Sequence, residues 1–108
     1  MNLPNIINKL LQAQHCFDSL AYSECFAETA VVHDENEVYE GKQQIGRWNE
    51  TTNAKYQTVL EPVDFCQDGS KAILTAKVSG TFEGSPVLLD YHFEITGGLV
   101  KSLEINLH

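Results

Sequence analysis

The apolar positions in the first part of the chain recur at helical spacing. Pro4 suits the first turn of a helix, because it has no backbone N–H to leave unpaired. The residues that follow show the i, i+3, i+4 pattern of one helical face: Ile6, Ile7, Leu10, Leu11 and Gln14. A second helix is predicted to begin near Asp18, whose carboxylate can accept hydrogen bonds from the free N–H groups. Its buried side is predicted to consist of Leu20, Ala21, Cys25 and Phe26.

A short hairpin is predicted between these helices and a third one. Residues 30–33 contain two β-branched residues, Val31 and Val32, and are predicted to form a short strand, residues 34–37 favour a turn, and residues 38–39 form the returning strand. Gly41 ends this hairpin and opens a helix that reaches Tyr56. One face of that helix carries Ile45, Trp48 and Thr52. The outward side is predicted to carry Lys42, Gln43, Gln44, Glu50 and Asn53.

The second half of the chain alternates between apolar and polar residues, which is typical of β-strands. Extended segments are predicted over residues 57–66, 71–82, 87–95 and 99–107, separated by turns of hairpin length. Such short turns make the sheet antiparallel. The apolar faces carry Ala72, Leu74, Ala76, Val78, Gly80 and Phe82, then Val87, Leu89, Tyr91, Phe93 and Ile95, then Leu99, Lys101, Leu103, Ile105 and Leu107.

These elements predict a single two-layer α+β domain over residues 1–108, in which helices cover one apolar face of a sheet. Ala72, Ala76 and Gly80 are small residues on that face and leave room above it. The sheet can therefore curve, and a curved sheet closed by helices tends to enclose a cavity.

The charge of the chain excludes several classes of partner. Lys plus Arg total 7 against 15 Asp plus Glu, a formal net charge of −8. A domain this acidic repels nucleic acid and anionic membrane surfaces. We find no apolar run long enough for a membrane span and no signal-peptide pattern, so we expect a cytoplasmic protein. The odd number of cysteines, Cys16, Cys25 and Cys66, predicts free and largely buried thiols.

Several segments resemble the SnoaL-like and ketosteroid isomerase-like branch of the nuclear transport factor 2-like superfamily. They are Cys25–Asp34, Tyr39-Glu40-Gly41, Ile45-Gly46-Arg47-Trp48, Tyr91–Ile95 and Gly97–Val100. The resemblance implies an α+β fold in which three N-terminal helices pack on a strongly curved, mostly antiparallel sheet enclosing a cone-shaped pocket. It also implies a homodimer formed through the sheet, and no cofactor. It is less informative about activity, because one fold of this kind hosts many functions.

The resemblance assigns roles to particular positions. Asp34 falls on the position of the general base that moves a proton next to a carbonyl group. The acid that stabilises the oxyanion falls at Tyr91, and the helix-one tyrosine of the isomerases falls near Leu10, where no tyrosine is close. Removing one oxyanion donor costs about 10²–10³ in rate, so this departure argues against steroid isomerisation itself.

Each candidate residue also has a purely structural interpretation. Asp34 is either a base with its pKa raised by an apolar cavity, or a solvated turn residue beside Glu35 and Glu37. Tyr91 either donates to a ligand carbonyl, or is satisfied by Asp34 or the backbone. The candidate ligand-binding residues are Trp48, Tyr56, Tyr22, Phe82 and Phe93. Each could equally be a core residue, and Tyr22 could instead form a hydrophobic staple with Phe17.

His92 and Asp90 share one strand face, but without a third ligand they are a weak basis for a metal site, and none is predicted.

Two functions remain open. One is a cofactor-free isomerase, cyclase or lyase that acts on a small carbonyl compound. The other is a dimeric domain that binds a small apolar ligand, or serves as a scaffold, without catalysis.

Overall fold

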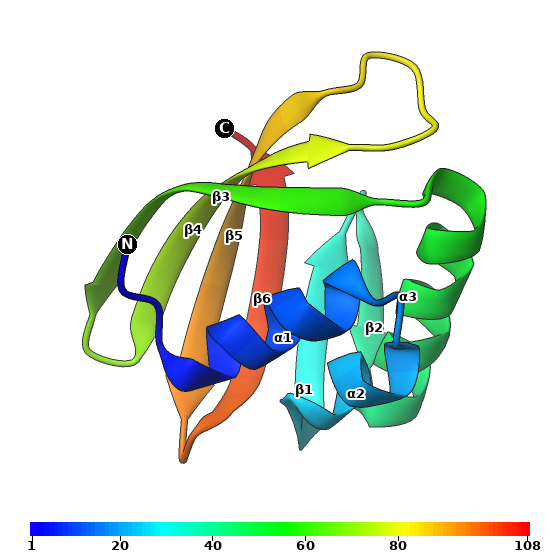
Figure 1. Ribbon diagram of the computed structural model, residues 1–108. Helices are drawn as coiled ribbons and strands as arrows, with labels where there is room; N and C mark the ends of the chain where they lie inside the picture. The colour runs from blue at the N-terminus through cyan, green and yellow to red at the C-terminus, as the bar shows by residue number, and fades with distance from the viewer.

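The computed structural model describes residues 1–108, and its elements follow the predicted order (Figure 1). Two helices precede a short hairpin, a third helix follows it, and four long strands complete the chain. The elements are α1 (Asn5–His15), α2 (Ser19–Glu24), β1 (Phe26–Asp34), β2 (Glu37–Glu40), α3 (Gly41–Tyr56), β3 (Val59–Asp68), β4 (Lys71–Ser79), β5 (Val87–Thr96) and β6 (Leu99–Leu107).

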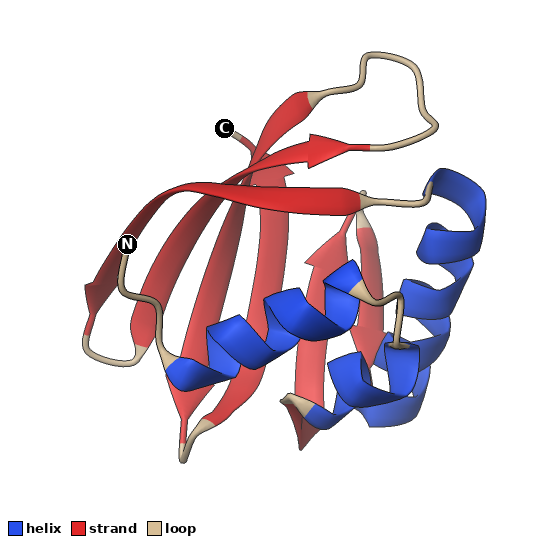
Figure 2. Cartoon of the chain, viewed as in Figure 1, coloured by secondary structure: helices blue, strands red, loops and turns tan.

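The strands form one six-stranded sheet in the order β2-β1-β6-β5-β4-β3. All neighbouring pairs are antiparallel except β1 and β6, which run parallel although they lie at opposite ends of the chain. The sheet is curved and stays open, and the three helices lie on its concave side (Figure 2). The fold is therefore α+β.

The core lies between the helices and the concave face of the sheet. It is a single cluster of 19 buried apolar residues. Ile7 and Leu10 of α1, Phe26 of β1, Ile45 of α3 and Leu74 of β4 are fully buried in it. The alternation predicted for β4 and β5 is confirmed, since Ala72, Ala76, Val78, Tyr91 and Phe93 are buried as well. No helix of the chain is long and apolar enough to cross a membrane.

The second helix begins as predicted but departs from the prediction at its C-terminal end and in its buried face. Asp18 caps it as expected, because its Oδ1 accepts from the N–H of Ala21 at 3.0 Å. The helix nevertheless ends at Glu24, so that Phe26 belongs to β1. Leu20, predicted to be buried, is 72% exposed, whereas Ser23 is buried. A helix of six residues is too short for its periodicity to fix the buried face.

The prediction for the inner face of β6 is correct at Leu103 and Ile105 and wrong at Lys101, because of a bulge. Ile95 pairs with Val100 and Glu94 with Ser102, which leaves Lys101 as an extra residue in the ladder. A bulge of this kind shifts the alternation by one position. Val100 and Leu103 are therefore fully buried, while Lys101 is exposed.

The strand predicted to reach Phe82 ends earlier, at Ser79. Beyond it the chain turns toward the end of α3, where the N–H of Thr81 donates to the carbonyl oxygen of Tyr56 at 2.7 Å. Gly80 makes this approach possible, because a Cβ there would lie 2.5 Å from the same oxygen. The expectation for the cysteines is correct only for Cys25, since Cys16 and Cys66 are free but exposed.

Candidate functional site

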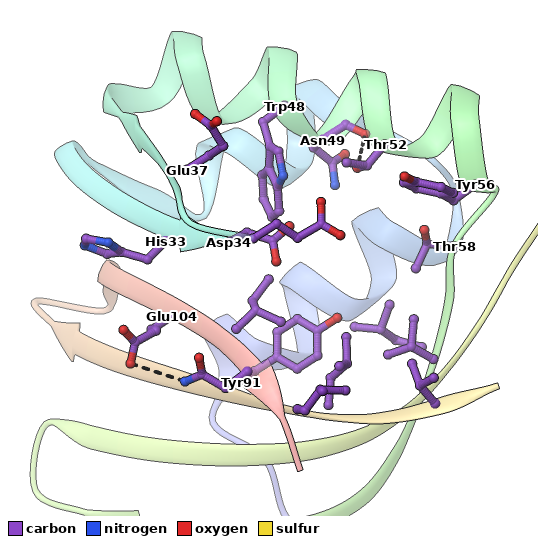
Figure 3. A pocket seen from close by; sticks show the side chains of 18 of the residues that line it. His33, Asp34, Glu37, Trp48, Asn49, Thr52, Tyr56, Thr58, Tyr91 and Glu104 are labelled. Carbon is purple, nitrogen blue, oxygen red and sulfur yellow. Dashed lines mark hydrogen bonds between the residues drawn. The ribbon is translucent and has the colours of Figure 1, made fainter. Parts of the chain in front are cut away.

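A cavity of about 760 Å³ opens between α3 and the concave face of the sheet. Residues far apart in the sequence line it: α3 and the end of β1 lie on one side, and β5 and β6 lie on the other (Figure 3). Its size is within the range of about 300–1,000 Å³ that is usual for small-molecule sites.

Asp34 is the last residue of β1 and lies on the wall of this cavity. The β1–β2 hairpin turns directly after it, at Glu35 and Asn36, which both have positive φ. Burial is the main cause that raises the pKa of the Asp34 carboxyl above its usual range, and the charge of Glu35 adds to it. The indole N–H of Trp48 faces the carboxylate and opposes this increase in the pKa. Asp34 is therefore a half-buried carboxyl group rather than a fully solvated turn residue.

Two phenol groups share the cavity with Asp34. Tyr91 of β5 is 5% exposed and Tyr22 of α2 is 3% exposed. Burial raises the pKa of each phenol, and the charge of Asp34 contributes to both increases. Tyr91 projects from β5 into the space below Asp34 and Trp48 (Figure 3).

Both hydroxyl groups are available to a ligand. No fully buried polar atom in the chain lacks a hydrogen-bond partner. Neither phenol makes a hydrogen bond within the chain, so each hydroxyl must reach the open space of the cavity that it lines. A buried Tyr hydroxyl normally finds a partner. These two are therefore donors without an internal acceptor.

Aromatic rings form much of the remaining wall. Trp48 is held between Tyr39, at 5.5 Å between ring centroids, and Tyr22, at 6.2 Å. At the other end of the cavity, Tyr56 packs edge-to-face on Phe82 with 6.0 Å between centroids. Such packing fixes the rotamers of these side chains. A flat or apolar ligand would therefore meet a preformed surface.

A polar network supports the helical side of the site. Gln14 donates to Asn53 Oδ1 at 2.8 Å and accepts from Asn49 Nδ2 at 2.8 Å. Asn49 Oδ1 accepts from Ser19 Oγ at 2.7 Å and from Asn53 Nδ2 at 3.0 Å. These bonds connect α1, α2 and α3. Gln14 and Asn49 also line the cavity, where they add polar groups to the aromatic wall.

The sequence analysis missed this network. It assigned Asn53 to the outward side of its helix, but Asn53 is 8% exposed because its amide group is enclosed by Gln14 and Asn49. A signal was present: Gln14 continues the apolar face of the first helix, and Asn49 and Asn53 are one helical turn apart.

Most of the predicted site residues lie around the same cavity. Those that line it are Asp34, Tyr91, Trp48, Tyr56, Tyr22 and Phe82. Phe93 is a correction: it is 2% exposed, stacks on Tyr91 at 6.4 Å and belongs to the core. The cavity occupies only one end of the inner sheet face, and Phe93 lies beyond it. Tyr22 packs on Phe26 at 5.5 Å and on Trp48, while its expected staple partner Phe17 is 46% exposed.

No group of three or more His, Cys, Asp or Glu side chains is arranged to hold a metal ion. Asp90, on the other face of β5, instead accepts from Thr75 Oγ1 at 2.7 Å and contacts His108 Nδ1 at 2.9 Å. The C-terminal residue is thus anchored to the sheet.

Comparison with known proteins gives close structural matches. The chain is 44% identical to a protein of Sinorhizobium meliloti that its name proposes to be a polyketide cyclase, with a TM-score of 0.93 over 96% of this chain and 95% of the other. A Pseudomonas putida protein with the same proposed activity is 20% identical, with a TM-score of 0.83 over 100% and 92% of the two chains.

A third similar structure contains a bound small molecule. This Catenulispora acidiphila protein has a ketosteroid isomerase-like fold and was crystallised with trimethylamine. It is 19% identical, with a TM-score of 0.88 over 97% of this chain and 86% of that one. No family model and no curated protein matches the chain.

Proposed function

This chain belongs to the nuclear transport factor 2-like superfamily, and we propose that it is a cofactor-free enzyme that moves a proton next to a carbonyl group. The product would be an isomer, a cyclised compound or an elimination product, depending on where the resulting enolate reacts. The names of the Sinorhizobium meliloti and Pseudomonas putida proteins agree with chemistry of this class.

One observation carries the proposal: a half-buried carboxyl group with a raised pKa shares a cavity with two phenol donors that have no internal acceptor. A general base works best when its pKa lies near the operating pH, and burial moves an aspartate in that direction. An oxyanion needs donors that are fixed before it forms. Asp34 supplies the first requirement, and Tyr91 and Tyr22 supply the second.

The proposed mechanism uses only side chains of this chain. Asp34 removes the proton from the carbon next to the carbonyl, the electron pair of the broken C–H bond forms the C=C bond of the enolate, and the π pair of the carbonyl moves to its oxygen. Tyr91, with Tyr22 beside it, donates hydrogen bonds to the enolate oxygen. Asp34 then returns the proton at another carbon, or the enolate attacks an electrophilic carbon of the same substrate. Trp48, Tyr56 and Phe82 hold the apolar part of the substrate.

Deuterium exchange tests this mechanism without knowledge of the natural substrate. We expect the protein to accelerate exchange of the protons next to the carbonyl of 2-tetralone in D₂O, followed by NMR. Asp34→Asn should reduce the enzymatic rate to background. The matched control is Asp68→Asn, an exposed carboxyl group outside the cavity lining. Exchange at the wild-type rate in Asp34→Asn would remove Asp34 from the mechanism.

The alternative is a dimeric ligand-binding domain without catalysis. It is favoured by the position of Leu10, which is fully buried in the core, so that α1 contributes no phenol to the cavity. The trimethylamine complex of the Catenulispora acidiphila protein is a second point in its favour. Binding of 2-tetralone with no exchange above background, and equal affinity in Asp34→Asn, would favour this alternative.

We also propose that the protein is a homodimer formed through the outer face of the sheet. Leu88 lies on that face, beside Lys77 of β4, and is 42% exposed. Sedimentation equilibrium should give twice the monomer mass of 12.1 kDa. A monomer at about 100 μM would contradict this proposal.

A further inference from the structure

The charged side chains that line the cavity carry one sign. Five carboxyl groups reach the lining, and no lysine or arginine does. The carboxyl groups belong to Asp34, Glu35, Glu37, Glu83 and Glu104. The lining thus contains five of the 15 acidic side chains of the protein and none of its 7 Lys and Arg side chains.

No basic side chain neutralises these carboxyl groups. The chain contains two ion pairs, Lys42 with Glu28 at 3.5 Å and His108 with Asp90 at 2.9 Å, and neither includes a lining residue. Lys55 lies over the ring of Tyr56, with Nζ 5.0 Å from the ring centroid, and forms no ion pair. His33 is the only nitrogen base in the lining.

The position of the charges matters as much as their number. Glu37 pairs with Asp34 across β1 and β2, and Glu104 pairs with His33 across β1 and β6, so these carboxyl groups lie at the end of the cavity near β1 (Figure 3). Glu35 follows Asp34 in the hairpin turn, and Glu83 lies next to Phe82. The four glutamates are exposed, whereas Asp34 is half-buried. Asp34 is therefore the least solvated of the five carboxyl groups in the lining.

Charges of one sign around a cavity with apolar walls reinforce one another. Low-dielectric walls focus the field, so the potential within the cavity is more negative than it would be over a flat surface. An anionic ligand would lose its hydration and be repelled by the carboxylates, and the two phenol hydroxyls could offer it hydrogen bonds but no compensating positive charge. An ammonium group would instead be attracted by the carboxylates.

We infer that this site accepts uncharged or positively charged carbonyl compounds and rejects carboxylated or phosphorylated ones. The inference deepens the proposed function and rests on it for the carbonyl group, but the selection by charge is a property of the cavity alone. Compounds that carry a phosphate or carboxylate group are therefore excluded as substrates. The proposed substrate class is that of neutral cyclic ketones and amino ketones.

Three probes of the same shape test this selection. They are 1-adamantanecarboxamide, which is neutral, 1-adamantanecarboxylate, and 1-adamantylmethylammonium. None absorbs where tryptophan is excited, and Trp48, the one tryptophan of the chain, lines the cavity and reports binding by its fluorescence. We expect the carboxylate to bind at least ~10-fold more weakly than the amide, and the ammonium at least as tightly as the amide, at low salt. Raising the salt concentration from about 20 mM to about 500 mM should reduce the differences in affinity between the three probes, because salt screens the carboxylates.

A charge-neutralised variant identifies the origin of the selection. The variant replaces three glutamates of the β1–β2 hairpin and β6 together, as Glu35→Gln, Glu37→Gln and Glu104→Gln. It should bind 1-adamantanecarboxylate at least ~5-fold more tightly than the wild type does, while its affinity for 1-adamantanecarboxamide stays within ~2-fold of the wild-type value. The control is Glu50→Gln, which removes an exposed charge on α3 outside the lining. It should leave the affinities for both probes unchanged.

The outcomes separate this inference from the proposed function. If the carboxylate binds as tightly as the amide, selection by charge is wrong, while the exchange reaction at Asp34 can still stand. If the probes discriminate as expected but 2-tetralone does not exchange, the inference holds for a binding protein and the catalytic proposal fails. If none of the three probes binds, the inference falls, and the exchange of 2-tetralone alone decides the catalytic proposal.

Discussion

Asp34 shows at the residue scale how a proposed catalytic position costs stability. The carboxyl group has a raised pKa in the folded chain because of burial and Glu35, and a pKa of about 3.9 when unfolded. The unfolded state therefore releases this proton at lower pH than the folded state. The contribution of the group to stability is present below about pH 4 and is lost as the pH rises through the folded pKa.

Asp34→Asn should consequently make the protein more stable while it removes activity. We expect a higher Tm than that of the wild type at about pH 7.5, and a difference that decreases toward zero below about pH 4. Thermal unfolding at a series of pH values measures this, with Asp68→Asn as the exposed control. A variant that is less stable than the wild type at neutral pH would show that the Asp34 carboxylate is stabilised in the fold.

The two phenols make a second prediction at the residue scale. Tyr91→Phe should lower the rate of exchange by about 10²–10³, as expected for one lost oxyanion donor, and Tyr22→Phe by a smaller factor. Because both donate to one oxygen, the double variant should lose less than the product of the two factors. Tyr56→Phe, which keeps the ring of the cavity wall, should change the rate by less than ~10-fold. Equal rates in the two single variants and the wild type would contradict the proposed donors.

The residues of the site were partly predictable. Asp34 and Tyr91 were assigned by the resemblance, and the candidate aromatic residues that also line the cavity are Trp48, Tyr56, Tyr22 and Phe82. The sequence could not decide whether Tyr22 forms a staple with Phe17 or reaches the cavity, or show that Phe93, on the strand face of Tyr91, lies beyond it. Both outcomes depend on how the helices lie on the sheet, which local spacing does not encode.

At the scale of the elements, the amide network should hold the helices in place. Asn49→Ala removes a donor to Gln14 and an acceptor for Ser19 and Asn53. Leaving buried polar groups unpaired costs about 1–3 kcal/mol, so we expect a loss of that size in the free energy of unfolding, measured in urea. Gln43→Ala, an exposed position on the same helix, should stay within about 0.5 kcal/mol. Equal losses in the two variants would mean that the network adds no stability.

The contact between Gly80 and the end of α3 gives the second prediction at this scale. A Cβ at position 80 would lie 2.5 Å from the carbonyl oxygen of Tyr56 and 3.0 Å from the ring of Phe82. Gly80→Ala should therefore lower the free energy of unfolding by about 1–3 kcal/mol, as overpacking does. Gly46→Ala is the contrasting control: its Cβ would meet Ser23 at an ordinary 3.4 Å, and removing a helical glycine should stabilise the protein. A stable Gly80→Ala would show that the α3 end can move.

The elements themselves were predicted well where their pattern is long and regular. Alternation identified β4 and β5, and helical spacing identified α1 and α3. The failures have local physical causes: a bulge at Lys101 reverses part of β6, and the Thr81–Tyr56 hydrogen bond ends β4 at Ser79. A bulge and a tertiary hydrogen bond both depend on a partner strand or helix that the sequence pattern does not specify.

At the scale of the whole molecule, composition predicted the sign of the charge but not where it gathers. The net charge of −8 predicts that polyanions are poor partners. The structure adds that five carboxyl groups line one cavity with no basic side chain among them. This arrangement requires β1, β2, β6 and the loop after β4 to meet, which only the folded chain brings about.

The most direct test of the central claim is the pKa of Asp34, measured by carbon-detected NMR titration with Asp34→Asn to assign the signal. A carboxyl group in a desolvated cavity, placed to remove a proton, should titrate above the reference value of about 3.9. A value at or below that reference would describe a solvated or ion-paired carboxylate, and would contradict the assignment of Asp34 as the general base.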